Sequence, residues 1–342
     1  MSSEDDILSP CKTKEDDEER NLRPQLLDQF IGQNGIIENL KVFIKSALMR
    51  KIPLDHVLLA GPPGLGKTTL AFIIAREMGV NIKSTSAPVI EKAGDLASIL
   101  TALEPNDILF IDEIHRLSPA IEEILYPAME DRTIDILIGQ GVGTKSVKLS
   151  ISPFTLIGAT TRTGLLTSAL RDRFGIPCKL NYYEDPELKT IALRSSSILG
   201  YTLTDSASDE IAKRSRRTPR IVNRLVRRVS DFAIVKGESE ISHETAKYAL
   251  TQLGIDEAGL DEMDRNILSV IIDHYDGGPV GVKTIAISVG EETDTIEEYY
   301  EPFLVQSGLL KRTSRGRMAT KLAYAHLNKK FIRDDQPEIW NS

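Results

Sequence analysis

The sequence predicts an α/β nucleotide-binding domain of the P-loop type, followed by an all-helical domain and a C-terminal winged-helix domain. Three observations lead to this prediction. The first is the stretch 61–69, GPPGLGKTT, which lies between an apolar run and a helical pattern. The second is an apolar run at 108–111 that ends in two acidic residues. The third is a pattern of three helices and a basic turn between residues 258 and 330.

The stretch 61–69 has the residues that a phosphate-binding loop needs. Glycines such as Gly64 and Gly66 let backbone N–H groups close on phosphate oxygens, and the N-terminus of the following helix adds a favourable dipole. We expect Lys67 to reach the β- and γ-phosphates of a nucleotide and the Thr68 hydroxyl to bind Mg²⁺. The alternative is an ordinary glycine turn before a helix, which would not require the lysine and threonine in this register.

Two carboxylates at the end of a buried strand supply the second half of the site. The strand 108–111 delivers Asp112 and Glu113 at its carboxyl end, where α/β sheets bind ligands. Asp112 suits the shell of Mg²⁺, and Glu113 can polarise an attacking water. The alternative is a strand followed by an acidic helix cap. Together with the P-loop, the two carboxylates predict a nucleoside triphosphatase.

Composition narrows the class of protein. The 342 residues are 41% apolar and 27% charged, and the length predicts two or three domains. No run is long enough to cross a bilayer and the acidic N-terminus does not resemble a signal peptide, so no membrane partner is expected. Cys11 and Cys178 have no metal or disulfide spacing, which predicts a cytoplasmic protein. The net charge of −8 implies that any DNA contact is local.

The patterns divide the chain into five segments. Residues 1–20 form an acidic tail that is expected to be disordered. Residues 21–183 form the large ATPase domain and residues 184–257 the all-helical lid. Residues 258–330 form the winged-helix domain, and residues 331–342 are a tail.

Residues 134–151 interrupt the α/β rhythm. Isoleucines alternate at 134–138, a glycine-rich stretch follows, and apolar residues alternate again at 147–151. This pattern predicts an inserted β-hairpin. The hairpin is either structural or a docking surface for a partner, with an uncharged tip at 139–144.

Three further positions in the chain can sense phosphate. Thr160 and Thr161 end the buried strand 154–159, and the sequence does not separate their roles. Arg173 follows a short helix, and an arginine near a phosphate site can stabilise charge in the transition state. Arg220 lies in the first turn of a helix, where the dipole disfavours a cation, which suggests that it meets phosphate. Ordinary surface arginines would give the same pattern.

The C-terminal region predicts a winged helix with an unusual charge distribution. Three helices, at 261–275, 282–289 and 293–306, precede a basic turn between two short strands. The third helix carries glutamates that phosphate would repel, so the wing is expected to touch DNA. A solvated basic turn is the alternative. The glutamates are Glu297, Glu298 and Glu301, and the flexible-loop cations suited to backbone contact without base readout are Arg312, Arg315 and Arg317.

The order of these motifs resembles the AAA+ ATPases and, among them, the RuvB family of Holliday-junction branch-migration motors. A P-loop alone would be shared by many families, whereas this series is specific. The resemblance runs from about Leu22 to Thr320. The stretches that carry it are 22–24, 30–33, 61–69, 112–117, 158–162, 170–175, 218–220 and 308–320.

The resemblance implies a role for each matching residue. The adenine-pocket positions are Leu22, Arg23, Ile31 and Tyr183. The phosphate positions are Gly64, Gly66, Lys67, Thr68 and Thr69, with Thr161 at sensor 1. Arg173 matches the arginine finger that reaches a neighbour's nucleotide, and Arg220 matches the sensor-2 arginine of the lid. A segment that faces the nucleotide across the subunit boundary is formed by Glu130, Asp131 and Arg132.

The resemblance also implies a function. A homo-hexameric ring would use ATP and Mg²⁺ to move double-stranded DNA at Holliday junctions. Hairpin 134–151 would bind RuvA, and the contact with RuvC would be indirect. A clamp-loader-like switch that translocates nothing is the alternative. A transcription regulator with sequence readout is a third, which the acidic third helix disfavours.

Overall fold

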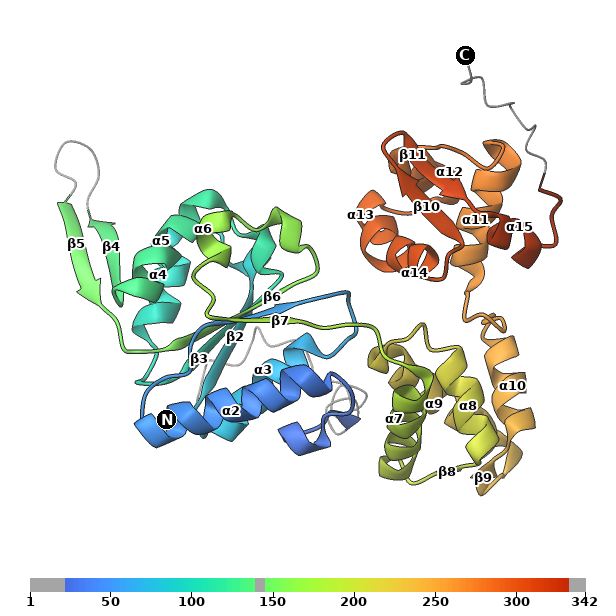
Figure 1. The fold of residues 1–342 in the computed structure, drawn as a ribbon, viewed down its shortest axis with the longest axis horizontal. Helices are drawn as coiled ribbons and strands as arrows, with labels where there is room; N and C mark the ends of the chain where they lie inside the picture. The colour runs from blue at the N-terminus through green and yellow to red at the C-terminus, as the bar shows by residue number, and fades with distance from the viewer. Residues whose placement is uncertain (1–21, 139–144, 332–342) are drawn as a thin grey trace, which may run out of the picture. The chain divides into compact units, whose positions relative to one another are not determined.

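A computed structural model describes residues 22–138 and 145–331 of the chain (Figure 1). The chain forms two compact units, which divide between Thr245 and Ala246. Within the described residues, no helix is both long and apolar enough to span a bilayer.

A five-stranded parallel sheet forms the centre of the first unit, in the order β2-β3-β6-β1-β7. The three inner strands, β3, β6 and β1, lack apolar–polar alternation because helices cover both faces, which is typical of parallel sheets in α/β proteins. The strands are β1 (Val57–Ala60), β2 (Ile82–Ser86), β3 (Ile108–Asp112), β6 (Thr155–Thr160) and β7 (Ile176–Lys179).

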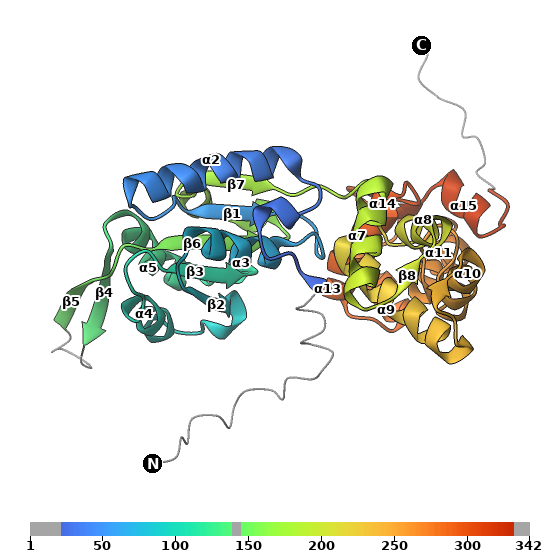
Figure 2. The same cartoon turned by 90° about the horizontal axis from the view of Figure 1, so that it is seen from below.

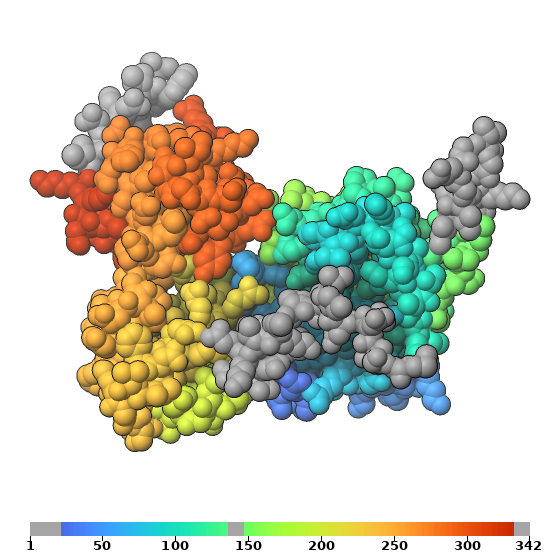
Figure 3. All heavy atoms as spheres, turned by 180° about the vertical axis from the view of Figure 1, so that it is seen from behind, coloured from blue at the N-terminus to red at the C-terminus, as the bar shows by residue number. Residues whose placement is uncertain are grey.

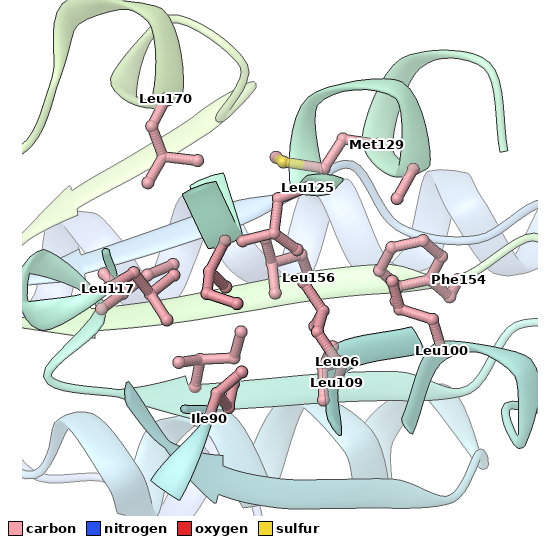
Figure 4. Packing of buried hydrophobic residues seen from close by; sticks show 14 of the residues in the cluster. Ile90, Leu96, Leu100, Leu109, Leu117, Leu125, Met129, Phe154, Leu156 and Leu170 are labelled. Carbon is pink, nitrogen blue, oxygen red and sulfur yellow. The ribbon is translucent and has the colours of Figure 1, made fainter. Parts of the chain in front are cut away.

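Helices cover both faces of this sheet (Figure 1). Helices α2 (Asn34–Arg50) and α3 (Lys67–Met78) lie on one face, and α4 (Ala93–Thr101) and α5 (Pro119–Glu130) lie on the other. Leucines of α4 and α5 pack on Leu109 and Leu156 of the strands to form a buried core (Figure 4). This core fixes the carboxyl ends of β3 and β6, which carry the acidic and threonine residues. The short elements between them are η1 (Leu27–Gln29), η2 (Ala87–Val89), η3 (Ile114–Arg116), η5 (Thr163–Leu165) and α6 (Ser168–Arg171).

The predicted hairpin is confirmed. Strands β4 (Thr133–Ile138) and β5 (Lys145–Ser150) pair antiparallel, with Asp135 opposite Lys148. Ile134 is buried against the α4–α5 core, which anchors the base of the hairpin. Its strands lie at the margin of the first unit, shown in green in Figure 3. The predicted tip at 139–144 lies outside the described residues.

A helical lid follows the sheet (Figure 2). Its long helix α9 (Pro219–Lys236) begins with proline after Thr218 and ends at Gly237, whose φ of 70° is the left-handed C-terminal cap that glycine adopts without strain. The other elements are α7 (Asp185–Ile198), α8 (Asp205–Lys213), α10 (His243–Gln252) and the two-stranded pair β8 (Thr202–Leu203) and β9 (Glu240–Ile241).

The second unit has its own apolar core, built from four helical segments and a hairpin. Helix α11 (Glu262–His274) starts with a reciprocal capping box between Asp261 and Asp264. The remaining elements are α12 (Val282–Val289), α13 (Thr293–Thr295), the π-helical turn η6 (Ile296–Tyr300), α14 (Glu301–Gln306), β10 (Leu310–Thr313), β11 (Gly316–Ala319) and α15 (Lys321–His326).

Candidate active site and nucleic-acid interface

A pocket in the first unit lies at the carboxyl ends of β1, β3 and β6, where α/β sheets bind ligands. It joins the P-loop to the start of α9 and to the segment that precedes α2. Fourteen predicted positions line it: Leu22, Arg23, Ile31, Gly64, Gly66, Lys67, Thr68, Thr69, Asp112, Glu113, Thr161, Tyr183 and Arg220, together with Pro24 of the motif 22–24.

Two glycines give the P-loop its shape. Gly64 has φ +82° and Gly66 has φ +95°, a region that side-chain-bearing residues rarely adopt. A Cβ on Gly64 would lie 3.2 Å from the Cβ of Arg220, and one on Gly66 would lie 3.2 Å from the ring of Phe30. The backbone N–H of Arg220 donates to the Gly64 carbonyl at 3.3 Å. Glycine at these two positions therefore lets the start of α9 and Phe30 approach the loop.

Lys67 is buried near two carboxylates and one arginine. Its Nζ donates to the carbonyls of Gly61 and Pro62, at 2.6 and 2.9 Å. Burial lowers the pKa of Lys67 to about 8; Asp112 and Glu113 oppose this effect, and Arg220 adds to it. A cation held at the start of a helix, beside carboxylates that can bind a metal, fits a nucleotide polyphosphate with its Mg²⁺ ion.

The two threonines at the end of β6 differ in environment. Thr160 is fully buried, and its hydroxyl contacts His115 Nδ1 at 3.0 Å and accepts from Arg162 N at 3.0 Å. Thr161 lines the pocket, and its hydroxyl lies 3.4 Å from Glu113 Oε2. Thr161 is therefore the residue of the pair that can meet a phosphate.

Tyr183 closes the pocket against the lid. Its hydroxyl donates to the Leu65 carbonyl at 3.3 Å, and burial raises the pKa of Tyr183 above its usual range. Its backbone N–H donates to Arg217 O at 3.1 Å. The segment before α2 is tied to the same region, because the side chain of Gln33 pairs with both backbone groups of Asn181. The predicted adenine positions thus come from segments far apart in the sequence.

Four predicted nucleotide positions lie outside the pocket of their own chain. Arg173 contacts Glu130 Oε1 at 3.1 Å, donates to the Ala169 carbonyl at 2.6 Å, and stacks over the Tyr126 ring at 4.4 Å. Glu130, Asp131 and Arg132 lie at the end of α5, and none of them lines the pocket. These four residues therefore lie apart from the pocket that the other predicted nucleotide positions line.

The pocket also includes residues that the sequence motifs do not predict. Arg194 and Asn223 lie on the lid helices, and the Asn223 amide oxygen accepts from the Ser195 hydroxyl at 2.7 Å. Asn223 follows Arg220 by three positions, so helical spacing could have indicated it. Arg194 gave no such signal. The residues outside the predicted motifs are Ile191, Arg194 and Asn223, whereas Phe30, Pro63 and Pro219 belong to the motif stretches 30–33, 61–69 and 218–220.

The wing of the second unit is a short antiparallel hairpin, with Arg312 directly opposite Arg317. Arg312 and Arg315 are exposed. The expectation that Arg317 is a flexible-loop cation is wrong. It lies in β11, it is buried, and its Nε donates to Glu301 Oε2 at 3.0 Å while an NH2 group reaches Glu297 Oε1 at 2.7 Å.

This pairing also corrects the expectation about the acidic helix. Glu297 and Glu301 were expected to repel phosphate, but they are partners of the wing arginines. Arg312 lies 3.6 Å from Glu301 and 3.9 Å from Glu297. The carboxylates therefore have cations beside them, and charge alone does not exclude this face from a contact with DNA.

Comparisons with known proteins agree with this arrangement. Residues 22–180 match the model of the Holliday junction DNA helicase RuvB P-loop domain, residues 183–256 the RuvB AAA lid domain, and residues 257–328 the RuvB C-terminal winged helix domain. The RuvB subunit of the Holliday junction branch migration complex of Paramagnetospirillum magneticum is 55% identical over 321 residues, which cover 94% of this chain and 92% of that protein.

Solved structures extend the comparison to three dimensions. The Thermotoga maritima RuvB Holliday junction branch migration motor has a TM-score of 0.84 and 51% identity, covering 91% of this chain and 99% of that chain. A point mutant of the same protein gives 0.85 and 52%, covering 90% and 99%. The predicted P-loop, lid and winged-helix architecture is therefore confirmed, and the chain belongs to the RuvB family.

Proposed function

We propose that this chain is an ATP-driven motor that moves duplex DNA and drives the branch migration of Holliday junctions in recombination and repair. The observation that supports this proposal most directly is the pocket, which joins Lys67, Glu113 and Thr161 of the sheet domain to Arg220 of the lid. A nucleotide bound there would contact both parts of the first unit. Hydrolysis would remove phosphate contacts between the nucleotide and the lid and so allow the lid to move. The winged-helix domain on the same chain would transmit this movement to DNA.

The substrate is ATP, and the residues present suit a Mg²⁺ ion with it. Thr68 is the second residue of α3 and Asp112 ends β3, and both line the pocket. They are the residues that would hold the ion, which would neutralise phosphate charge in the transition state. The backbone of Gly64, Gly66 and Thr69 would hold phosphate oxygens, and Lys67 would bind the β- and γ-phosphates.

Glu113 is the base in this scheme. It follows β3 with a left-handed backbone φ of 52°, which turns its side chain out of the strand direction beside Asp112. A carboxylate at this position can accept a proton from the attacking water. Thr161, 3.4 Å from this carboxylate, would sense the γ-phosphate, and Arg220 would contact phosphate from the lid.

Arg173 completes the site in a ring of identical subunits, which we take to be a hexamer. Because Arg173 and residues 130–132 lie outside their own chain's pocket, we assign them to the nucleotide of a neighbour. The remaining partners are RuvA, docked on hairpin 134–151, and RuvC, contacted indirectly. We place the activity in the cytoplasm.

The wing is the proposed DNA contact. Arg312 and Arg315 are exposed cations on a short hairpin, suited to the phosphate backbone without base readout. Arg317 reaches DNA only if phosphate replaces its two glutamates. Contact with the backbone alone fits a motor that must move over any sequence.

A branch-migration assay tests the proposal. The chain, RuvA and ATP are incubated with a synthetic four-way junction, and strand separation is followed on a gel. We expect separation with the parent and none with Glu113→Gln, although that variant still binds ATP and the junction. DNA-stimulated hydrolysis without strand separation would favour the clamp-loader-like switch instead.

A further inference from the structure

A buried histidine connects the end of β6 to the carboxylate of Glu113. His115 lies in η3, directly after β3, and only 3% of its side chain is exposed. Its Nδ1 contacts the Thr160 hydroxyl at 3.0 Å, and its Nε2 lies 3.4 Å from Glu113 Oε2. His115 itself does not line the pocket. The proposed function gives it no role.

The contacts of Thr160 bear on the histidine tautomer. The backbone N–H of Arg162 donates to the Thr160 hydroxyl at 3.0 Å. The hydroxyl still has one proton to donate and a second lone pair. When it donates this proton to His115 Nδ1, the neutral ring carries its own proton on Nε2, which faces Glu113 Oε2 at 3.4 Å. In this arrangement His115 is a donor toward the proposed base.

The same end of β6 is attached to the phosphate loop. The N–H of Gly61 donates to the Thr160 carbonyl at 3.1 Å. Thr160 therefore contacts both the first glycine of the loop and His115. Thr161, the next residue, contacts the same carboxylate oxygen as His115. A displacement of this strand end would therefore move both groups that hold Glu113.

We propose that His115 is a positioning residue for ATP hydrolysis, which transmits the position of Thr160 at the end of β6 to the carboxylate of Glu113. The inference rests on the proposed function, because it takes Glu113 as the base. Contacts of 3.4 Å are long for hydrogen bonds, and catalytic contacts commonly shorten when substrate binds. His115 would hold the carboxylate ready for the water in the triphosphate state and release it when β6 moves.

Two substitutions of His115 distinguish the role of Nε2 from that of Nδ1. His115→Gln places an amide nitrogen near the position of Nε2 and keeps a donor toward Glu113. His115→Asn places its polar atoms near Nδ1 and loses that donor. In single-turnover hydrolysis, we expect His115→Asn to be slower by about 10²-fold, as for other misplaced catalytic groups, and His115→Gln to keep most of the rate. The Kd for ATP should change by less than about threefold in both, because neither removes a phosphate contact.

A readout without nucleotide tests the tautomer. Imidazole ¹⁵N shifts of the parent should show a protonated Nε2, and Thr160→Val should remove this bias. His56 is the matched control, because it is a half-buried histidine at the other end of β6, where its Nδ1 accepts from Leu156 N at 2.8 Å. His56→Gln should lower thermal stability without a selective loss of the hydrolysis step.

A double-mutant cycle decides whether His115 acts through Glu113. In a Glu113→Gln background, His115→Asn should add almost no further loss, because residues that act as a unit are not additive. Equal losses in both backgrounds, or a parental rate for His115→Asn in the Glu113 parent, would overturn the positioning role alone. Substantial turnover by Glu113→Gln itself would instead remove the base assignment, and both proposals would fail.

Discussion

Arg317 of the wing and Glu301 of α14 form a buried ion pair inside the second unit. Arg317 Nε donates to Glu301 Oε2 at 3.0 Å, and the two residues are 8% and 4% exposed. This ion pair connects strand β11 of the wing to helix α14. A loss of DNA binding in an Arg317 variant would therefore mix two effects, a missing contact and a displaced wing.

Arg317→Ala should destabilise the wing more than it affects a single DNA contact. The substitution leaves the buried Glu301 carboxylate with the longer contact to Arg312, at 3.6 Å, and removing one partner of a buried pair typically costs about 3 kcal/mol or more. We expect faster amide hydrogen exchange in the β10–β11 ladder of the full-length protein. Arg317→Met combined with Glu301→Leu should recover much of the protection, since apolar replacement of such a pair is often neutral. Unchanged exchange in Arg317→Ala would show that the pair does not hold the wing.

Arg312→Ala combined with Arg315→Ala should weaken DNA binding by a similar factor on unrelated sequences. Each lost phosphate contact lowers the slope of log K against log salt by about 0.9 on duplex DNA, so the pair should lower it by about 1.8. Basal ATPase should survive, and its stimulation by DNA should be lost. Lys330→Ala, an exposed cation outside the wing, is the control and should keep the slope. An unchanged slope in the double variant would move the DNA path elsewhere.

Arg173→Ala should keep nucleotide affinity and suppress hydrolysis by about 10³-fold or more, as other arginine fingers do. The reason is that Arg173 lies outside its own pocket, against Glu130 and Tyr126. Mixing this variant with Lys67→Ala should restore some activity, because certain interfaces then pair an intact Lys67 with an intact Arg173. If mixed rings form and remain inactive, Arg173 does not act across the subunit boundary.

ATP affinity should fall as pH rises above about 8. Burial lowers the pKa of the Lys67 ammonium to about 8, whereas a bound polyphosphate favours the charged form and raises it. Below about pH 8 the ammonium is already charged and affinity is full. Above it, binding must take up a proton, so Kd should rise by up to about tenfold per pH unit. Titration calorimetry with ATP measures this change. Lys67→Arg should flatten the profile, since guanidinium stays charged. A flat profile in the parent would contradict the lowered pKa.

Arg194→Ala should weaken nucleotide binding. Across residues 22–138 and 145–331, the Arg194 guanidinium has no hydrogen-bond or ion-pair partner, and burial lowers its pKa. A hydrogen bond from such a cation to an anionic ligand is worth about 1.5 kcal/mol or more, so Kd should rise by about tenfold. Fluorescent ADP titration measures it, with Arg50→Ala, an exposed arginine at the end of α2, as the control. Equal affinities of Arg194→Ala and the parent would mean that this arginine only covers the pocket.

The order of local motifs was sufficient to predict much of the protein. The P-loop, the acidic strand end, the hairpin and the wing each depend on residues close together in the chain, where spacing directly determines backbone geometry. The topology of a parallel sheet likewise predicts that residues from separate motifs line one pocket. Parallel strands place their carboxyl ends on one edge of the sheet, so Lys67, Asp112 and Thr161 had to lie near one another.

Tertiary structure alone decided the contacts between distant elements. The sequence could not separate Thr160 from Thr161, because β6 is buried on both faces and its pattern does not alternate. It could not reveal that Arg317 meets Glu301, because sixteen positions and a turn separate them. The link from Thr160 through His115 to Glu113 likewise joins two strands that are separated by a helix and a hairpin. Spacing predicts which backbone segments form, whereas the packing of those segments decides which side chains meet.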